Sequence, residues 1–317
     1  MRYAVIIPLF NKAPYIQKTL ESVINQSFQD FELVVVDDGS TDGSYDVADS
    51  VLNTSGIKYQ LIHQENAGVS SARNNGVASS VGEYLCFLDA DDWWAPTFLE
   101  RMNAMIQRYP DAGIYGTNYY YVKNGRQRVC VTNTKTGYIN YCKVYSETLT
   151  MPLTSISVAI PRCVFDEMKG FRPHLKLGED FDLWIKIALK YKVAFLNEPL
   201  AYYNQDSDPK WRGIGHLVDP QNHMLWNLDY LSSYENSNPD YKQLVDTMRS
   251  NSLLRYYISK KYHSMAAVEL NKVDWSFQSK QIRRLYKLPI PVLIIRQYFL
   301  SLGSKVKQLL LGFYHSL

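Results

Sequence analysis

The sequence predicts an α/β protein with a mixed, mainly parallel sheet, helices on both faces of that sheet, and a helical C-terminal extension. Three observations lead to this prediction. Short apolar runs alternate with amphipathic helical segments through the first half of the chain, as in parallel sheets covered on both faces. The rhythm then changes to a hairpin and fewer strands. Beyond residue 213 the pattern predicts helices only.

The first half contains repeated strand–helix units. The apolar run 4–10 predicts the first strand, and Pro14 opens a helix whose apolar side chains share one face. Right-handed crossovers between such units produce a parallel sheet. The same reasoning predicts strands at 31–36, 57–63 and 83–88, and helices at 44–52, 69–80 and from residue 96.

The second half is less regular. Lys123-Asn124-Gly125 lies between two strand-like segments and predicts a β-hairpin. The elements expected after it are a helix near 138–149, a strand at 157–160, a short helix from Pro161 to Gly170, a helix at 180–191 and a strand at 193–203. We therefore predict one domain over 1–212, with halves at 1–110 and 111–212, and a helical, basic region over 213–317.

Charge also divides the chain. The formal net charge is only +3, yet eleven of the 34 basic residues and two of the 31 acidic residues lie from Arg255 onward. An acidic body with a basic tail indicates different partners for the two parts. From charge alone, the tail suits either nucleic acid or an anionic membrane surface. Its interleaved apolar residues favour a membrane interface, and a helical pair packed on the first domain is the alternative.

The cysteines and the apolar runs indicate the cellular compartment of the protein. The four cysteines form no CxxC pair and predict reduced thiols in a cytoplasmic protein. The first apolar run is too short for a signal peptide. We find no stretch that reaches the roughly 20 apolar residues needed to cross a bilayer.

Acidic residues cluster where two predicted strands end. Asp37 and Asp38 follow the second strand, and Asp89, Asp91 and Asp92 follow the fourth. Ligands bind beyond the carboxyl ends of strands in open parallel sheets, so we expect both clusters at one crevice. Three crowded carboxylates repel one another unless a cation such as Mg²⁺ or Mn²⁺ neutralises them. An acidic turn that only precedes the next helix is the alternative interpretation.

Two further segments carry candidate binding groups. Residues 66–74 open a helix, so free backbone N–H groups and Arg73 there favour an anion such as phosphate. A local ion pair is the alternative for Arg73. Glu179 and Asp180 begin an amphipathic helix, where acids are favourable in any case and where a carboxylate near the crevice can act as a general base.

Several enzyme classes are disfavoured. No G-x-G-x-x-G follows the first strand, and no Walker A sequence is present. These absences argue against a dinucleotide-dependent dehydrogenase and a P-loop kinase. No nucleophile constellation stands out, and the six histidines lack metal-ligand spacing.

Six segments, taken in order, resemble the family 2 glycosyltransferases with a GT-A fold. Together they span about residues 3–205, and they include Asp89-Ala90-Asp91, which is similar to the DXD motif of that family. The matching segments are 5–11, 27–33, 36–42, 66–74, 87–92 and 178–180. The resemblance implies a Rossmann-like sheet, with a nucleotide-binding half over 1–110 and an acceptor-binding half over 111–212.

The resemblance also implies roles for individual residues. Asp180 matches the catalytic base, with Glu179 beside it, and Asp91 and Asp92 would bind Mn²⁺ or Mg²⁺. Phe10 stands where Tyr is frequent, which keeps stacking on the base but removes a hydroxyl contact. The nucleotide-binding positions would be Pro8, Phe10, Asn11, Asp37, Asp38, Asn66, Gly68, Arg73, Asp89, Ala90 and Asp91.

These roles imply a metal-dependent, inverting glycosyltransferase of cell-surface polysaccharide biosynthesis. We expect a nucleotide-diphosphate sugar donor, with a UDP-sugar favoured, and a glycan or lipid-linked saccharide acceptor, but no nucleic acid. We also expect a cytoplasmic enzyme with a peripheral contact on the inner membrane face through its basic C-terminus. A nucleotidyltransferase would instead show a Gly-rich basic loop where 8–12 lies. A non-catalytic scaffold of a polysaccharide assembly complex, the other alternative, would show a damaged acidic site.

Overall fold

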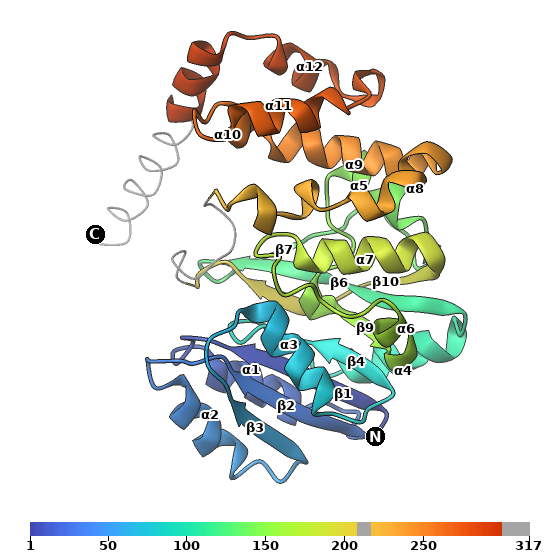
Figure 1. Cartoon of the computed structure of the whole chain (residues 1–317). Helices are drawn as coiled ribbons and strands as arrows, with labels where there is room; N and C mark the ends of the chain where they lie inside the picture. The colour runs from blue at the N-terminus through green and yellow to red at the C-terminus, as the bar shows by residue number, and fades with distance from the viewer. Residues whose placement is uncertain (208–216, 300–317) are drawn as a thin grey trace. The chain divides into compact units, whose positions relative to one another are not determined.

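The computed structural model of the protein describes residues 1–207 and 217–299. In this part of the chain one mixed sheet has the strand order β3-β2-β1-β4-β9-β6-β10-β5, with β7 paired to β6 and β8 to β10 (Figure 1). The predicted α/β class with a mainly parallel sheet is confirmed. The strands are β1 (Tyr3–Leu9), β2 (Phe31–Asp37), β3 (Tyr59–His63), β4 (Tyr84–Phe87), β5 (Trp93–Trp94), β6 (Ala112–Lys123), β7 (Arg126–Val129), β8 (Gly137–Ile139), β9 (Val158–Pro161) and β10 (Lys192–Asn204).

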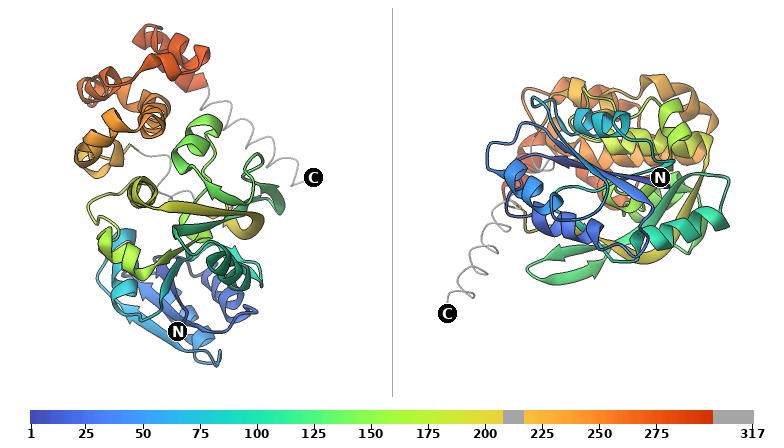
Figure 2. Two further views of the ribbon diagram at one scale, coloured as in Figure 1. Left: turned by 90° about the vertical axis from the view of Figure 1, so that its right-hand side faces the viewer. Right: turned by 90° about the horizontal axis from the view of Figure 1, so that it is seen from below.

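Helices cover both faces of the sheet. One face carries α1 (Ile16–Ile24), α2 (Ser44–Leu52) and α4 (Phe98–Arg108), and the other carries α3 (Val69–Ala78), α6 (Arg162–Glu167) and α7 (Glu179–Lys190) (Figure 2). Because side chains alternate along a strand, Val5 and Ile7 of β1 join the core beneath α1. Ile6 faces α3, where a Cβ on Gly76 would lie 2.6 Å from its Cγ2 atom. The glycine therefore lets α3 pack closely on β1.

Parallel pairing brings three strand ends to one edge. β1 pairs in parallel with β2, where Leu9 is opposite Asp37, and with β4, where Ile6 is opposite Phe87. The chain segments that follow these three strands therefore leave the sheet side by side. They carry candidate nucleotide and metal ligands, whereas the candidate phosphate segment 66–74 follows β3.

The structure differs from the sequence-based elements in two places. The helix predicted near 138–149 begins only at Tyr141, as α5 (Tyr141–Thr148), because β8 pairs in antiparallel fashion with β10. The short strand β5 was not predicted, since two residues are too few to show a period. The predicted hairpin is present between β6 and β7, with Asn124 and Gly125 at φ 48° and 70°, as a two-residue turn of this kind requires.

The chain forms two compact units, and the first ends at Ser232. The predicted boundary at 212 lies outside the described residues. The first unit extends beyond that boundary because short 3-10 turns pack against the helical layer. Tyr230, for example, donates a hydrogen bond to Asp182 Oδ1 of α7 at 2.7 Å.

The second unit is helical in its described residues, as predicted. It is built around a buried guanidinium, that of Arg249, which is 2% exposed. Arg249 donates to Glu235 at 2.8 and 2.9 Å and to Glu269 at 3.2 Å, so the buried charge is fully paired. The helices are α8 (Ser232–Ser237), α9 (Pro239–Ser252), α10 (Leu254–Tyr257), α11 (His263–Asn271) and α12 (Lys280–Tyr286), followed by helical residues 290–299.

Candidate active site

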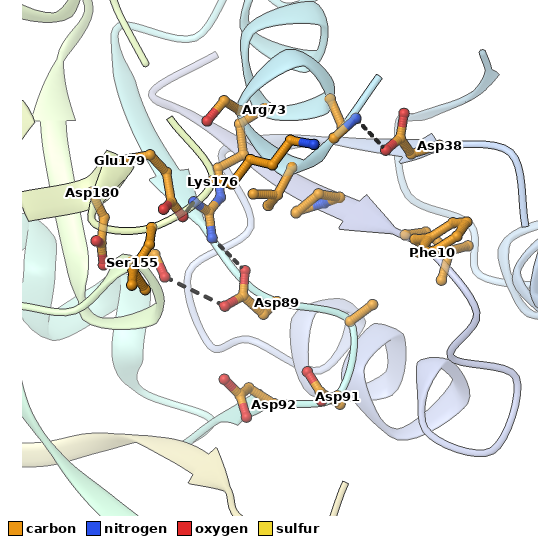
Figure 3. A pocket seen from close by; sticks show the side chains of 18 of the residues that line it. Phe10, Asp38, Arg73, Asp89, Asp91, Asp92, Ser155, Lys176, Glu179 and Asp180 are labelled. Atoms are coloured by element: carbon orange, nitrogen blue, oxygen red, sulfur yellow. Dashed lines mark hydrogen bonds and ion pairs between the residues drawn. The ribbon is translucent and has the colours of Figure 1, made fainter. Parts of the chain in front are cut away.

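A cavity of about 570 Å³ opens at the carboxyl edge of β1, β2 and β4. Its size is typical of small-molecule sites. Figure 3 shows side chains from separate parts of the chain arranged around it. The predicted site residues that line it are Pro8, Phe10, Asp38, Asn66, Gly68, Arg73, Asp89, Ala90, Asp91, Asp92, Glu179 and Asp180.

Two predicted nucleotide-binding residues, Asn11 and Asp37, are not among the residues that line the cavity. Asn11 accepts a hydrogen bond from Thr41 N at 2.9 Å, and its own N–H donates to Ser40 Oγ at 3.0 Å. Asp37 is fully buried, accepts from Ser40 N at 3.3 Å and lies 2.7 Å from His63 Nδ1. Both side chains hold the turn after β2, so their placement does not support a direct nucleotide contact.

Asp38 is 3% exposed and anchors the start of α3. Its carboxylate accepts from the backbone N–H groups of Ala67 at 2.8 Å and Gly68 at 2.9 Å, and from Gln64 Nε2 at 2.7 Å. The prediction that N–H groups of this segment are free for an anion is wrong for Ala67 and Gly68, because the strand end delivers a carboxylate to them. The role of Asp38 in nucleotide binding stays a prediction.

Arg73 of α3 is buried between two carboxylates. It donates to Asp89 Oδ1 at 2.7 Å and to Glu179 Oε1 at 3.2 Å, and its side chain is 3% exposed. Arg73 therefore ties the loop after β4 to the beginning of α7, two segments that are distant in sequence. Because its charge is already balanced, the structure gives Arg73 a positioning role.

Helix α1 and strand β10 support the loop that follows β4. Thr19 Oγ1 lies 3.0 Å from the carbonyl oxygen of Ala90 and 2.7 Å from that of Asp92. The side chain of Asp92 is buried and accepts a hydrogen bond from Asn204 N at 2.7 Å. These contacts hold residues 89–92, here called the acidic loop, from two sides.

The acidic loop fits a divalent cation. Burial, with smaller contributions from the neighbouring Asp91 and Asp89, raises the pKa of Asp92 well above its usual value, which disfavours its charged form. Lys12 Nζ, 2.6 Å from Asp91 Oδ2, offsets part of the negative charge of the loop. Among the described residues no group of three or more candidate ligands could hold a metal by itself. Mg²⁺ commonly takes one or two carboxylates plus phosphate oxygens, so Asp91 and Asp92 are suitable when a nucleotide is bound.

A left-handed turn brings Glu179 and Asp180 to the cavity. Gly178 has φ 83°, and a Cβ there would lie 2.9 Å from Met224 Cβ, so the position strongly favours glycine. Figure 3 shows Glu179 and Asp180 on the opposite side of the acidic loop from Phe10 and Asp38. The cavity therefore has Phe10 and Asp38 at one end and the paired acids Glu179 and Asp180 at the other.

The two acids of this pair differ in their surroundings. Burial and, to a smaller extent, the adjacent Glu179 raise the pKa of Asp180 to about 7, although Arg73 opposes both. Glu179 is the partner of Arg73, whereas the Asp180 carboxylate accepts a hydrogen bond from Phe181 N at 2.8 Å. A carboxyl group that titrates near neutrality is well matched to a general base.

Several residues of the cavity were missed at the sequence level. Lys12 immediately follows the first matching segment, just after a predicted strand, and this position is a signal that could have found it. Ser155 Oγ, 3.4 Å from Asp89 Oδ2, comes from a stretch with no periodic pattern. Phe181 stacks on Tyr145 of α5, with ring centroids 5.4 Å apart and planes at 10°. No local pattern connects these two rings.

A family model described as glycosyl transferase family 2 matches residues 4–163, which is half of the chain. The chain belongs to glycosyl transferase family 2. The matched residues contain β1 to β9 and the acidic loop, whereas Glu179 and Asp180 lie after them.

Curated relatives agree with this family. A protein of Rickettsia felis named "Uncharacterized glycosyltransferase" is 25% identical in an alignment of 299 positions that covers 87% of this chain and 49% of that relative. Glycosyltransferase GlyA of Streptococcus pneumoniae is 39% identical over 119 residues, which are 38% of this chain and 17% of GlyA. The chain thus spans about half or less of the length of these family 2 relatives.

Solved structures share the fold. Staphylococcus aureus TarS in complex with UDP-GlcNAc superposes with a TM-score of 0.73 at 19% identity, over 87% of this chain and 83% of that chain. The mannosyltransferase PcManGT of Pyrobaculum calidifontis, in complex with GDP-Man and Mn²⁺, gives 0.58 at 19% identity, over 95% and 80%. These likenesses support the GT-A fold that the sequence resemblance implied.

Proposed function

We propose that the protein transfers a sugar from a nucleotide-diphosphate donor to an acceptor hydroxyl, with metal dependence and inversion at the anomeric carbon. One observation carries this proposal: a single cavity combines Phe10 and Asp38 at one end, the acidic loop in the middle, and Asp180 at the other end. In this order the groups match the parts of a sugar nucleotide: the base and ribose at one end, the diphosphate in the middle, and the sugar beside the catalytic base. Family membership supports the reaction class.

In the proposed mechanism, Asp180 acts on the acceptor. Its carboxylate takes the proton of the acceptor hydroxyl as that oxygen attacks the anomeric carbon from the face opposite the diphosphate. One displacement inverts the stereochemistry, so an α-linked donor yields a β-linked product. Glu179 stays paired with Arg73, which leaves Asp180 as the proton acceptor.

The residues of the acidic loop act on the leaving group. A divalent cation held by Asp91 and Asp92 would supply positive charge to the departing diphosphate. Lys12 adds a charge beside Asp91, and Thr19 and Arg73 keep the loop in place. Phe10 provides an apolar surface for the base at the far end of the cavity.

A donor screen tests the proposed activity. Because TarS was solved with UDP-GlcNAc and PcManGT with GDP-Man, we would test both sugar nucleotides with Mn²⁺ and favour the uridine donors. The expected result is release of the nucleoside diphosphate and, with a saccharide acceptor, a product of inverted anomeric configuration by NMR. A product of retained configuration would contradict the single displacement. Release of pyrophosphate from a nucleoside triphosphate would instead indicate nucleotidyl transfer.

The acceptor is proposed to bind near Asp180, as a glycan or lipid-linked saccharide of cell-surface polysaccharide biosynthesis. Phe181 lines the cavity, and its stacking on Tyr145 joins α5 to α7. Aromatic faces of this kind suit the apolar faces of sugar rings. Acceptor specificity then depends on the 111–212 half of the protein.

The activity should depend on pH through Asp180. We expect kcat/KM for the acceptor to rise about tenfold per pH unit below pH 7 and to level off above it, since only the deprotonated base accepts a proton. Glu179→Gln removes a negative neighbour that raises the pKa of Asp180, so its profile should move to lower pH. A wild-type profile that is flat down to about pH 5 would contradict the assignment.

We also propose a peripheral contact between the C-terminal unit and anionic lipid. No helix in residues 1–207 or 217–299 has the length and apolar character to cross a bilayer. Residues 290–299 are helical, and Leu293 is buried with 2% exposure. At about 100° per residue, a broad arc on the other side of this helix is apolar and 45–66% exposed, through Val292, Ile294, Ile295, Tyr298 and Phe299. The cations nearest in sequence are Arg283, Arg284, Lys287 and Arg296.

Vesicle sedimentation tests this contact with the full chain. We expect binding to phosphatidylglycerol vesicles and weak binding to phosphatidylcholine vesicles, because the cations are attracted to anionic headgroups. Ile295→Glu with Phe299→Glu should reduce binding about tenfold or more. Val268→Glu, at a residue of the same unit that is 59% exposed, is the matched control and should bind as wild type. Equal binding to both lipids, or no loss in the double variant, would refute the contact.

A further inference from the structure

The cationic side chains that line the cavity differ in their partners. Lys12 Nζ is paired with Asp91 at 2.6 Å, and Arg73 is held between two carboxylates at 2.7 and 3.2 Å. Lys176 also lines the cavity, and within the described part of the chain its ammonium group has no hydrogen-bond or ion-pair partner. Among residues 1–207 and 217–299, Lys176 is thus the cavity cation without a carboxylate partner.

Backbone donors near the cavity do not replace this cation. The N–H groups of Ala67 and Gly68, which a phosphate could otherwise use, donate to Asp38. The cavity wall also carries six carboxylates, which repel an anion: Asp38, Asp89, Asp91, Asp92, Glu179 and Asp180. A diphosphate therefore needs positive charge beyond the paired residues.

The backbone of Lys176 is held in place although its side chain is exposed. Lys176 N donates to Asn222 O at 2.8 Å, and Met224 N donates to Leu177 O at 3.0 Å. A parallel bridge between Leu177 and His223 continues this pairing. Figure 3 shows the Lys176 side chain extending into the cavity, toward the side where Asp38 and Phe10 lie.

We propose that Lys176 binds the diphosphate of the donor nucleotide. This inference rests on the proposed function. It adds a positively charged diphosphate-binding residue that the family resemblance did not identify. The backbone of Lys176 is fixed, and its ammonium group has no partner in the described residues. On its flexible side chain, this charge can stay in contact with the diphosphate while the bond between the diphosphate and the sugar breaks. The same charge stabilises the nucleoside diphosphate product.

Calorimetric binding of paired probes tests the proposal. Wild-type protein with Mn²⁺ is titrated with UDP and uridine, and with GDP and guanosine, and the pair that binds is used for the variants. Lys176→Met should weaken nucleoside diphosphate binding about 10- to 100-fold, as expected for loss of a charged hydrogen bond. Binding of the nucleoside, which lacks phosphate, should change less than about twofold. Lys176→Arg should restore most of the diphosphate affinity.

The outcomes distinguish a phosphate contact from a structural role of Lys176. Lys192→Met, a substitution of a 58% exposed lysine that does not line the cavity, is the control and should bind as wild type. Unchanged diphosphate binding in Lys176→Met would overturn the inference and leave the proposed function standing. Equal loss of nucleoside and diphosphate binding would also overturn it, because it indicates a structural role. Failure of wild type to bind either diphosphate would overturn the proposed function and this inference together.

Discussion

Asp180→Asn is expected to lower kcat about 10²- to 10⁴-fold, the contribution typical of a general base. The amide is nearly the same size as the carboxylate but cannot take the proton of the acceptor hydroxyl. Donor binding should be retained, since the nucleotide end of the cavity is built from other segments. The measurement is single-turnover transfer to a saccharide acceptor, with nucleoside diphosphate affinity measured in parallel.

The fold should tolerate Asp180→Asn well. Asn removes a carboxylate that burial already disfavours in its charged form, so the free energy of unfolding should not fall by more than about 1 kcal/mol. Asp166→Asn, at an exposed acid of the same unit that does not line the cavity, should be fully active. Wild-type turnover in Asp180→Asn would remove this residue from the mechanism.

Asp91→Ala is the second substitution with a large expected effect. It removes a proposed metal ligand and the partner of Lys12, so the leaving diphosphate loses positive charge worth several kcal/mol. We expect kcat to fall about 10²- to 10⁴-fold. Excess Mn²⁺ should not restore the rate, and chelation with EDTA should lower the wild-type rate to a similar level.

Stability and metal binding check this second result. Asp91→Ala relieves repulsion with Asp92 while it leaves Lys12 without its acid, so we expect little net change in the urea midpoint. Mn²⁺ binding in the presence of the nucleoside diphosphate, followed by electron paramagnetic resonance, should weaken in the variant. An active enzyme with unaltered Mn²⁺ binding would show that Asp91 is not a ligand.

The strands and the edge at which the site forms were predictable because their cause is local. Apolar runs such as 4–10 have to be buried on both faces, and the acids of 37–38 and 89–92 directly follow such runs. Once parallel pairing is expected, covalent geometry alone places those acids at one edge. The family resemblance then linked Asp180 to the same edge, which local pattern could not do.

The states of the site residues were not predictable from local pattern. Sequence reasoning assigned both Asp37 and Asp38 to nucleotide binding, yet Asp37 pairs with His63 while Asp38 faces the cavity and holds the turn before α3. It expected Arg73 to contact a nucleotide, whereas the structure places it between two carboxylates. These outcomes depend on segments that meet only in the folded chain.

The sequence by itself determined the order of most elements, the acidic strand ends and the membership of glycosyl transferase family 2, because each follows from short segments and their order along the chain. The tertiary structure alone decided which charges are paired and why the pKa of Asp180 lies near 7. It also decided that Lys176, among the cations that line the cavity, has no carboxylate partner within the described residues. Burial and Coulomb interactions depend on distances through space. Those distances are set by packing between distant segments.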